Sequence, residues 1–319
     1  AKMKKLLSVL ACTALVLGSL TGCGSSAKKY PEKTINVVVP YTAGGGTDLM
    51  VRTVGANIDL DGQNMIVTNI EGASGLTGTL ECYHADPDGY TLVSMAAETW
   101  GAQWMSGALD FDACAEMTPL CVIAEDPNVI AVAANSEWET FDALVEYAKS
   151  AGGKFTIAST SSGGSNESFS YGLAEVAGFD FTYVPYDGGA KSRTAVLGGE
   201  NDAVVCQVSE IKSLADAGEM RVLGVAAEER SQCVEGPTFV EQGYDIVFGL
   251  HRSLWGTPGL SDEVISYLEG KLETACGTDE VKQQLLDLGY EPAYVGSEEL
   301  AAISVETSEQ LEHWVTLIS

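Results

Sequence analysis

The residues in this sequence that are best suited to binding a ligand lie in glycine-rich turns. In residues 37–49 (VVVPYTAGGGTDL) an apolar run ends at a proline, three glycines follow, and a helical pattern begins. Gly44, Gly45 and Gly46 let the backbone turn tightly and approach a ligand without side-chain interference. Their amides, together with the N–H groups that open the helix, can hold a carboxylate or a phosphate.

A similar turn lies in the second half of the chain. Residues 182–199 (TYVPYDGGAKSRTAVLGG) repeat the strand, the Pro-Tyr pair, the paired glycines and the helical pattern. Ligands of open α/β sheets bind at the carboxyl ends of strands, so the two turns could face one crevice. The alternative is chance, because strand-turn-helix units recur in every α/β fold.

The motifs of nucleotide-binding proteins and enzymes are incomplete. No lysine follows the first glycines, as a P-loop requires, and GGGTDL lacks the third glycine of a dinucleotide-binding turn. His84, His251 and His313 stand outside any HExxH motif, and the GGSNE stretch is not a GxSxG nucleophile elbow. A glycosidase-like pair of carboxylates stays open in principle. We expect a binding protein, not an enzyme, with no cofactor, no metal and no catalytic residue.

The N-terminal segment predicts export. Lys4 and Lys5 precede an apolar run of roughly 15 residues, which is too short to span a bilayer. The run ends in Leu-Thr-Gly-Cys, which resembles the bacterial lipobox. We therefore expect a signal peptide at residues 1–22, a lipid on Cys23 and a flexible tether over residues 23–33. The alternative is an ordinary signal peptide with a chance cysteine.

Charge and cysteine content narrow the class further. The net charge of −28 repels polyanions, so nucleic acid is not an expected partner. Any anionic ligand must then be held by local dipoles against the field of the whole chain. Six cysteines follow Cys23, and an even set in an exported protein could pair. Their apolar surroundings favour buried free thiols, which behave as small hydrophobic groups.

The order of apolar segments predicts an α/β fold. Short Val/Ile-rich runs such as INVVV, MIVTNI, PLCVIAE and VIAVAA alternate with helical patterns, which is typical of parallel sheets covered on both faces. Phe141, Leu144, Val145 and Ala148 share one helical face. Three later helices have start signals in residues with capping side chains, namely Ser261, Thr278 and Ser297.

Five motifs in order resemble the periplasmic solute receptors of tripartite tricarboxylate transporters, the TctC or Bug family. VVVPYTAGGGTD is similar to the family's strand-Pro-Phe/Tyr-glycine loop, and IEGASGLTGTLECYHADPDGYTLV ends in PDGYTL, a family motif that it matches fully. FTIASTSSGGSNESF, VPYDGGAKSRTAVLGGENDAVV and MRVLGVAAEERSQCVEGPTFVEQGYDI are similar to three further segments. The resemblance covers nearly the whole mature chain.

The resemblance implies a type II-like periplasmic-binding-protein fold with a cleft between two parallel or mixed-sheet lobes. We place lobe 1 at residues 34–124 plus 247–319 and lobe 2 at residues 125–246. It also implies an extracytoplasmic, membrane-anchored monomer that passes a small carboxylate-bearing solute, or an amino acid, to a permease of one large and one small membrane subunit. A binding protein for an amino-acid or amine-bearing ligand, serving a sensor or another uptake system, is the main alternative, and an enzyme is a second one.

Carried over by position, the resemblance implies a ligand site built by both lobes. The first lobe contributes Tyr41, Thr42, Ala43, Gly44, Gly45, Gly46, Thr47, Asp48, Ser74, Gly75, Glu98 and Thr99. The second contributes Ser162, Gly164, Ser165, Asn166, Tyr186, Asp187, Gly188 and Gly189. Members of the family typically hold a carboxylate with backbone amides, hydroxyls and bridging waters, and seldom with arginine.

Three carboxylates depart from the family pattern, namely Glu98, Glu167 and Asp187. If they face the cleft, their repulsion would weaken the binding of a di- or tricarboxylate. A ligand that carries an amine as well as a carboxylate would then be favoured, or a bound cation would be needed. If they point into solvent, the identity of the ligand stays open.

Overall fold

The computed structural model describes residues 30–160 and 162–318. The chain divides into two units, residues 1–32 and 33–319, and everything below concerns the second unit. The predicted signal peptide, Cys23 and most of the predicted tether lie outside the described residues. Within the described part, no helix has the length and apolar character that a membrane span requires.

A ten-stranded sheet forms the framework of the second unit. Its strands are β1 (Ile35–Val39), β2 (Met65–Asn69), β3 (Thr91–Ser94), β4 (Thr118–Ala133), β5 (Thr156–Thr160), β6 (Thr182–Tyr186), β7 (Ala203–Gln207), β8 (Met220–Val225), β9 (Gly249–Gly256) and β10 (Glu291–Val295). The order is β2-β1-β3-β9-β4-β7-β5-β6, and both β8 and β10 pair with β4.

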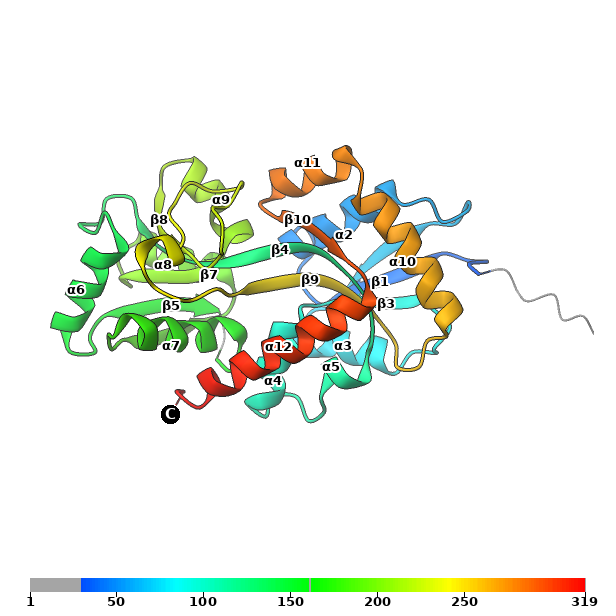
Figure 1. The fold of residues 1–319 in the computed structure, drawn as a ribbon, viewed down its shortest axis with the longest axis horizontal. Helices are drawn as coiled ribbons and strands as arrows, with labels where there is room; N and C mark the ends of the chain where they lie inside the picture. Colours follow the sequence, from blue (N-terminus) through cyan, green and yellow to red (C-terminus); the bar gives the residue numbers. More distant parts are fainter. Residues whose placement is uncertain (1–29, 161, 319) are drawn as a thin grey trace, which may run out of the picture. The chain divides into compact units, whose positions relative to one another are not determined.

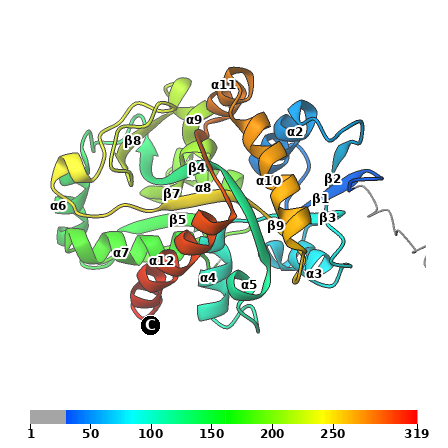
Figure 2. The ribbon, with the colours of Figure 1, turned by 45° about the vertical axis from the view of Figure 1, so that its right-hand side comes forward.

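The long strand β4 divides the framework into two parts. Its first half pairs with β10, and its second half pairs with β7 and β8. We call β2, β1, β3, β9 and β10 the first sheet, and β6, β5, β7 and β8 the second sheet. In Figures 1 and 2, β4 and β9 run side by side from one part into the other.

The predicted parallel arrangement is confirmed at the centre of each sheet. β1 lies between β2 and β3, and β5 lies between β6 and β7, all in parallel pairs. The side chains of Ile35 and Val37–Val39 are fully buried, as expected for a strand that is covered on both faces. The strands β9 and β10 were not predicted, because His251, Arg252 and Pro292 break their apolar patterns.

The structure corrects the prediction at β4. PLCVIAE and VIAVAA read as two strands separated by Asp126-Pro127, yet they form one strand of 16 residues. Pairing with β9 continues through this point, where Pro127 lies opposite Gly249. A Cβ atom on Gly249 would lie 2.8 Å from Cα of Pro127. The glycine therefore allows the two backbones to approach closely where the strands leave the first sheet.

The helices cover the sheets on both sides (Figure 1). They are α2 (Gly46–Asn57), α3 (Leu76–Tyr83), α4 (Ala97–Met105), α5 (Ala113–Glu116), α6 (Phe141–Ala151), α7 (Ser165–Ala177), α8 (Gly189–Leu197), α9 (Val208–Asp216), α10 (Asp262–Cys276), α11 (Asp279–Leu288) and α12 (Ser297–Val315), with short 3-10 turns η1 (Ala73–Gly75) and η2 (Val240–Gln242). The predicted apolar face of α6 is buried as expected.

The predicted helix caps are confirmed in two of the three cases. The hydroxyls of Ser261 and Thr278 accept hydrogen bonds from the third residue of α10 and α11, respectively. The prediction for Ser297 was wrong, because α12 already includes this residue and its N-cap is Gly296. The amide of Ser297 donates instead to the Glu269 carboxylate at 2.7 Å.

The last helix connects the two parts of the fold. α12 packs against α4 beside the first sheet and against α7 beside the second. Near its end the ring of Trp314 packs edge-on against Phe169 and Phe248 in the core around the second sheet. Large apolar contacts of this kind bury area that contributes roughly 25 cal/mol per Å². The end of α12 is therefore anchored in the second part of the protein.

The six cysteines after Cys23 are free thiols in the structure, as their apolar surroundings predicted. Five are buried and Cys114 is half-buried. Burial raises the pKa of Cys82 and of Cys276 to about 12, so both stay protonated at neutral pH. Thiols in this state act as small hydrophobic groups.

Candidate functional site

A cavity of about 1000 Å³ lies where the two sheets meet. Its walls are loops that follow the carboxyl ends of β1, β2, β5, β6 and β7, and its floor includes side chains of β9 and of the residue before β10. The volume falls at the upper end of the range for small-molecule sites, about 300–1,000 Å³. Loops from both sheets therefore face one space.

The first glycine loop joins β1 to α2. The amide of Gly45 donates to the Thr42 carbonyl at 3.1 Å and closes the turn. Gly45 is also the N-cap of α2, and no side chain bonds to the helix amides from this position. A Cβ atom on Gly46 would lie 2.5 Å from the Tyr290 hydroxyl. Glycine therefore lets the start of α2 lie directly against the cavity floor.

Asp48 stabilises this loop from the side that faces away from the cavity. Its carboxylate accepts hydrogen bonds from the Gly44 amide at 2.9 Å, from Arg52 Nε and from Asn69. Burial raises its pKa, but the bonds from Arg52, Gly44 and Asn69 outweigh burial, so the pKa lies below its usual value. The carboxylate orders the loop without lining the cavity, so its negative charge does not face a ligand there.

The second sheet presents two loops of the same kind. Gly188, with φ of +104°, is the N-cap of α8, and its amide donates to the Tyr186 carbonyl at 3.0 Å. Gly164 is the N-cap of α7, and again no side chain caps the helix. The Glu167 carboxylate accepts from the Gly163 amide at 2.6 Å, which repeats the Asp48–Gly44 arrangement. Glu167 thus holds a loop and does not line the cavity.

The cavity brings most of the predicted site residues together. Those that line it are Tyr41, Thr42, Gly45, Gly46, Thr47, Ser74, Gly75, Thr99, Gly164, Ser165, Asn166, Tyr186, Asp187, Gly188 and Gly189. Those that do not line it are Ala43, Gly44, Asp48, Glu98 and Ser162. Ala43, Gly44 and Ser162 are exposed, Asp48 points back into its own loop, and Glu98 faces another cavity.

Sequence reasoning missed the charged floor of the cavity. Arg252 of β9 donates from Nε and Nη2 to Asp126 Oδ2 at 3.0 and 2.5 Å. Asp126 is fully buried and also accepts from the amide and hydroxyl of Ser209 at the start of α9. The guanidinium of Arg252 lies 5.6 Å from the centre of the Tyr290 ring. In the sequence, the signal for this ion pair was the charged residue Arg252 in a segment that is otherwise largely apolar.

A second ion pair lies between α8 and α9. Arg193 Nη1 and Glu210 Oε2 are 3.3 Å apart, and both residues line the cavity. The pair lies against the start of α8, because a Cβ atom on Gly189 would be 2.5 Å from Glu210 Oε1 and 2.8 Å from Arg193 Nη1. Neither residue was predicted, since their sequence positions carry no motif.

Amide side chains order the wall of the cavity that the second sheet contributes. Gln207 at the end of β7 donates to Asn128 and to Asn166, and Asn128 also donates to Asn166. These three side chains are buried, so the network orders the start of α7 from the strand ends behind it. None of the described residues that line the cavity is histidine or cysteine. The arrangement offers hydrogen bonds and charges, which suit binding.

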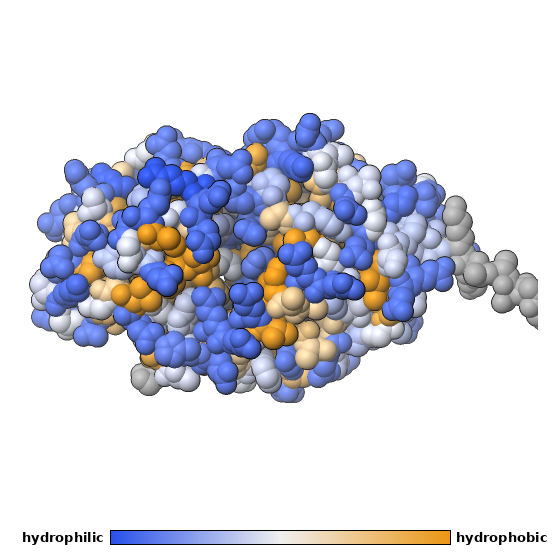
Figure 3. Space-filling view, in the orientation of Figure 1, coloured by the Kyte–Doolittle hydropathy of each residue, from blue (hydrophilic) through white to orange (hydrophobic). Residues whose placement is uncertain are grey.

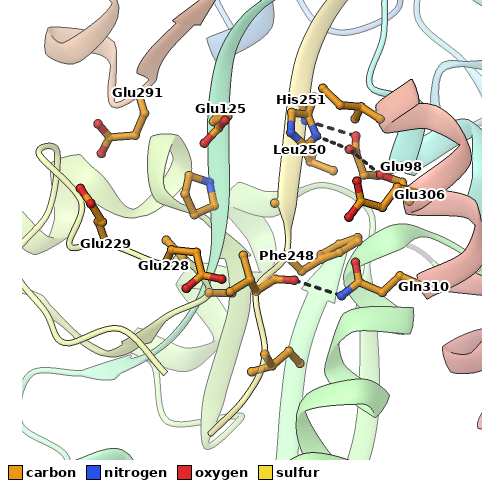
Figure 4. Close-up of a pocket in the computed structure, with 18 of the residues that line it drawn as sticks. Glu98, Glu125, Glu228, Glu229, Phe248, Leu250, His251, Glu291, Glu306 and Gln310 are labelled. Carbon is orange, nitrogen blue, oxygen red and sulfur yellow. Dashed lines mark hydrogen bonds and ion pairs between the residues drawn. The ribbon is translucent and has the colours of Figure 1, made fainter. Parts of the chain in front are cut away.

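A second cavity of about 980 Å³ lies on the other side of β4 and β9 (Figure 4). Glu98 of α4 lines this cavity, and its side chain is 1% exposed. Its carboxylate bonds to His251 Nδ1 at 2.6 Å, accepts from the amide of His251 at 3.2 Å, and accepts from Thr307 of α12 at 3.4 Å. The carboxylate therefore ties β9 to α4 and α12.

Acidic residues surround this histidine. Figure 4 shows Glu125 and Glu306 on either side of the Glu98–His251 pair, and the face drawn in Figure 3 is mainly hydrophilic. Burial lowers the pKa of His251, but the hydrogen bond and charge of Glu98 and the charges of Glu125 and Glu306 outweigh it. The pKa of His251 is therefore raised. No group of three His, Cys, Asp or Glu residues in the described part of the chain is arranged to hold a metal ion.

We expect the free energy of unfolding to fall as the pH rises through the raised pKa of His251. The protonated ring is stabilised in the folded state, so its contribution is complete below the ordinary histidine pKa of about 6.5 and is lost as the pH passes the folded-state value. Urea unfolding of the native chain and of His251→Gln at about pH 5, 7 and 9 measures this difference. The fall should disappear in His251→Gln.

The control for this prediction is His313→Gln. The ring of His313 is 58% exposed and pairs with Glu175 on the surface, so its loss should leave the pH dependence of the native chain in place. An identical pH dependence in the native chain and in His251→Gln would contradict the role given to the Glu98–His251 pair.

The chain is similar to one family of proteins along most of its length. The pattern of the family described as "Tripartite tricarboxylate transporter family receptor" (TctC) matches residues 50–319. The protein named "UPF0065 protein in gbd 5'region" of Cupriavidus necator is 28% identical over 304 residues, which cover 94% of this chain and 91% of that protein.

Solved structures share the fold. A TctC solute binding protein from Polaromonas is 26% identical, with a TM-score of 0.75 over 90% of this chain and 99% of that one. MatC from Rhodopseudomonas palustris, solved with bound malate, is 24% identical, with a TM-score of 0.76 over 91% of this chain and 100% of that one.

These similarities confirm the predicted two-lobed solute-binding fold and the predicted class. The solved relatives are binding proteins, and the family is one of receptors instead of enzymes. The family pattern covers well over half of the chain, and both glycine loops of the second sheet and the start of α8 lie inside it. The chain therefore belongs to the TctC family of tripartite tricarboxylate transporter receptors.

Proposed function

We propose that this receptor captures a small carboxylate-bearing solute in the cavity between its two sheets and delivers it to a tripartite secondary transporter. The permease would consist of one large and one small membrane subunit, which with the receptor make up the three parts of a tripartite transporter. The proposed ligand site comprises the predicted residues that line the cavity, with Arg252, Arg193, Glu210 and Tyr290 added on its floor.

The observation that carries the proposal is the pairing of the glycine loops. The loop before α2 in the first sheet and the loops before α7 and α8 in the second sheet open onto the same cavity. At each of these three helix starts no side chain caps the amides. Uncapped amides at a helix N-terminus favour an anion, and two opposing sets suit a carboxylate held between lobes. The malate bound by MatC, which shares the fold, supports a carboxylate ligand.

The lobes that close on the solute would be residues 34–124 plus 247–319 and residues 125–246. The two lobe connections fall near residues 125 and 247, where β4 and β9 pass between the sheets. Two adjacent crossing strands form a natural hinge, because a small change in their twist moves one sheet toward the other. The end of α12, which packs on α7, would have to move with this closure.

The receptor would work outside the cytoplasm as a monomer. The sequence supports export by a signal peptide at residues 1–22, lipidation of Cys23 and a flexible tether over residues 23–33. A lipid with more than one acyl chain would hold the receptor stably on the membrane. Radiolabelled palmitate should enter the native precursor in cells, and the Cys23→Ser variant should take up none.

A thermal-shift screen tests the proposed function. A ligand that binds only the folded state at about 100 times its Kd stabilises it by about 2.7 kcal/mol, which raises Tm by several degrees. We expect such a rise with one or more small carboxylates or amino acids, and none with nucleotides or uncharged sugars. If no carboxylate or amino acid raises Tm, the proposal fails.

A further inference from the structure

Every cation that faces the cavity is already paired with a carboxylate. Among the described residues that line it, the cations are Lys191, Arg193 and Arg252. Lys191 pairs with Asp187 at 3.1 Å, Arg193 pairs with Glu210 at 3.3 Å, and Arg252 pairs with the buried Asp126. A ligand with two or three carboxylates would therefore meet no uncompensated cation.

A further carboxylate adds to this balance. Glu71 also lines the cavity, and its partner is the uncharged hydroxyl of Thr42 at 3.1 Å. The lining residues Glu71, Asp187 and Glu210 balance the three cations in number, and Asp126, buried behind Arg252, is a fourth carboxylate, so the charge of the site and its ion-pair partners is negative. Like charges a few ångströms apart repel by about 1–4 kcal/mol near a protein surface. One carboxylate on the ligand can be held by loop amides, but a second would meet net negative charge.

Glu210 is the carboxylate best placed to meet a ligand. Its Oε2 atom is buried and lies 3.3 Å from Arg193 Nη1, but the two atoms do not meet with hydrogen-bond geometry, and neither has a hydrogen bond among the described residues. Buried polar atoms are normally hydrogen-bonded, so this ion pair leaves the Glu210 carboxylate able to accept from a further donor. Oε1 lies against the backbone of Gly189, where the amides of α8 begin. A group that binds Glu210 is therefore next to a group that binds those amides.

The electrostatic influence of Glu210 reaches across the cavity. Burial raises the pKa of Tyr41 in the first sheet, and the charge of Glu210 raises it further against the opposing charge of Arg252. Tyr290 on the cavity floor responds to the same two charges. Glu210 lines the cavity, and its charge acts on side chains that line the opposite wall and the floor.

We propose that the solute is a zwitterion, an amino acid or a related amino carboxylate, whose ammonium group binds the carboxylate of Glu210 while its carboxylate binds the amides at the glycine loops. This inference rests on the proposed function of the cavity. The short distance between carboxylate and ammonium in an α-amino acid matches the adjacency of Gly189 and Glu210. The ammonium supplies the positive charge that the paired side chains do not.

Pairs of amino acids and hydroxy acids with the same carboxylates distinguish a zwitterion site from a site that binds any carboxylate. Alanine and lactate, or aspartate and malate, have the same carboxylates and differ chiefly in an ammonium or a hydroxyl. By calorimetry, the native protein should bind the amino acid of each pair at least about tenfold more tightly, since hydrogen bonds between charged groups are the strong ones. Equal or tighter binding of both hydroxy acids would overturn the inference.

The variant Glu210→Gln assigns the preference to one residue. It removes the charge but keeps the size, so the ratio of amino-acid to hydroxy-acid affinity should fall at least about tenfold, mainly through weaker amino-acid binding. Asp216→Asn is the matched control, because Asp216 lies on the same helix, pairs with Lys212 at 2.8 Å and does not line the cavity. An unchanged ratio in a folded Glu210→Gln variant would overturn the inference.

The outcomes also distinguish this inference from the proposed function. If hydroxy acids bind as well as amino acids, and both are lost when a glycine loop is altered, the carboxylate site stands and the zwitterion does not. If no ligand of either kind binds the native protein, both fail. Circular dichroism of each variant verifies the fold, and the native protein alone already decides the ligand preference should Glu210→Gln misfold.

Discussion

Solute binding is expected to be lost in Gly188→Val. Gly188 has φ of +104° and ψ of 146°, a backbone region that is close to one populated essentially by glycine alone. A β-branched residue there costs on the order of 1–3 kcal/mol unless the loop changes conformation. No atom lies within 4 Å of an added Cβ, so the effect acts through the backbone and not through a clash. The amides at the start of α8 would then leave their positions, and Kd should rise at least about 100-fold.

The matched control for this variant is Gly199→Val. Gly199 follows the other end of α8, also has a positive φ of +75°, and has no atom within 4 Å of an added Cβ, but it does not line the cavity. Both variants should lose comparable stability in urea unfolding, and only Gly188→Val should lose binding by calorimetry. Retained affinity in Gly188→Val would contradict the role of the second loop.

A valine substitution in the loop before α2 tests the part of the site that the first sheet contributes. A Cβ atom on Gly45 would lie 3.0 Å from the Thr42 carbonyl oxygen, which accepts the hydrogen bond that closes the turn. Gly45→Val should therefore open this turn and weaken binding at least about tenfold while the fold remains. If only one of the two loops matters, the solute is not held between the lobes.

Asp126→Ala is expected to be the most destabilising of the single changes considered. Asp126 is fully buried at the point where the paired strands β4 and β9 pass between the two sheets, and it accepts hydrogen bonds from Arg252 and from the amide and hydroxyl of Ser209. Removing one partner of a buried ion pair typically costs about 3–5 kcal/mol, because the remaining charge stays buried and unpaired. Urea unfolding should show a loss of this size.

Two comparisons test the cause of that loss. Asp216→Ala removes an exposed partner of Lys212 and should cost about 1 kcal/mol or less. Asp126→Ala combined with Arg252→Met removes both charges, so the combined loss should be smaller than the sum of the two single losses. A loss below about 1 kcal/mol in Asp126→Ala alone would show that the pair does not stabilise the crossing.

The elements that sequence patterns predicted well are those with local causes. Apolar runs determined β1 and β5, and capping hydroxyls determined the starts of α10 and α11. β4 was predicted as two strands because Asp126-Pro127 is typical of a turn, and only its distant partner β9 keeps it extended. Ser297 has a capping side chain, but the carboxylate of Glu269 takes its hydrogen bonds from another helix.

The candidate site also contains residues that a local pattern could identify and residues that only tertiary contacts bring together. The glycine loops could be recognised because their residues are contiguous and adjoin a strand and a helix. Arg252 and its partner Asp126 are 126 residues apart, and Arg193 meets Glu210 only after α8 and α9 pack. Glu98 follows a strand end like other cleft residues, yet it points to the opposite side of β9 because His251 there offers both a ring nitrogen and an amide. Such roles depend on tertiary contacts that no local pattern encodes.

A crystal structure with the solute that gives the largest thermal shift tests the central claim most directly. The account predicts that carboxylate oxygens of the solute lie within hydrogen-bond distance of main-chain amides from both the loop at residues 45–47 and the loop at residues 188–190. A solute held by only one of these loops, or bound beside His251 in the second cavity, would contradict it.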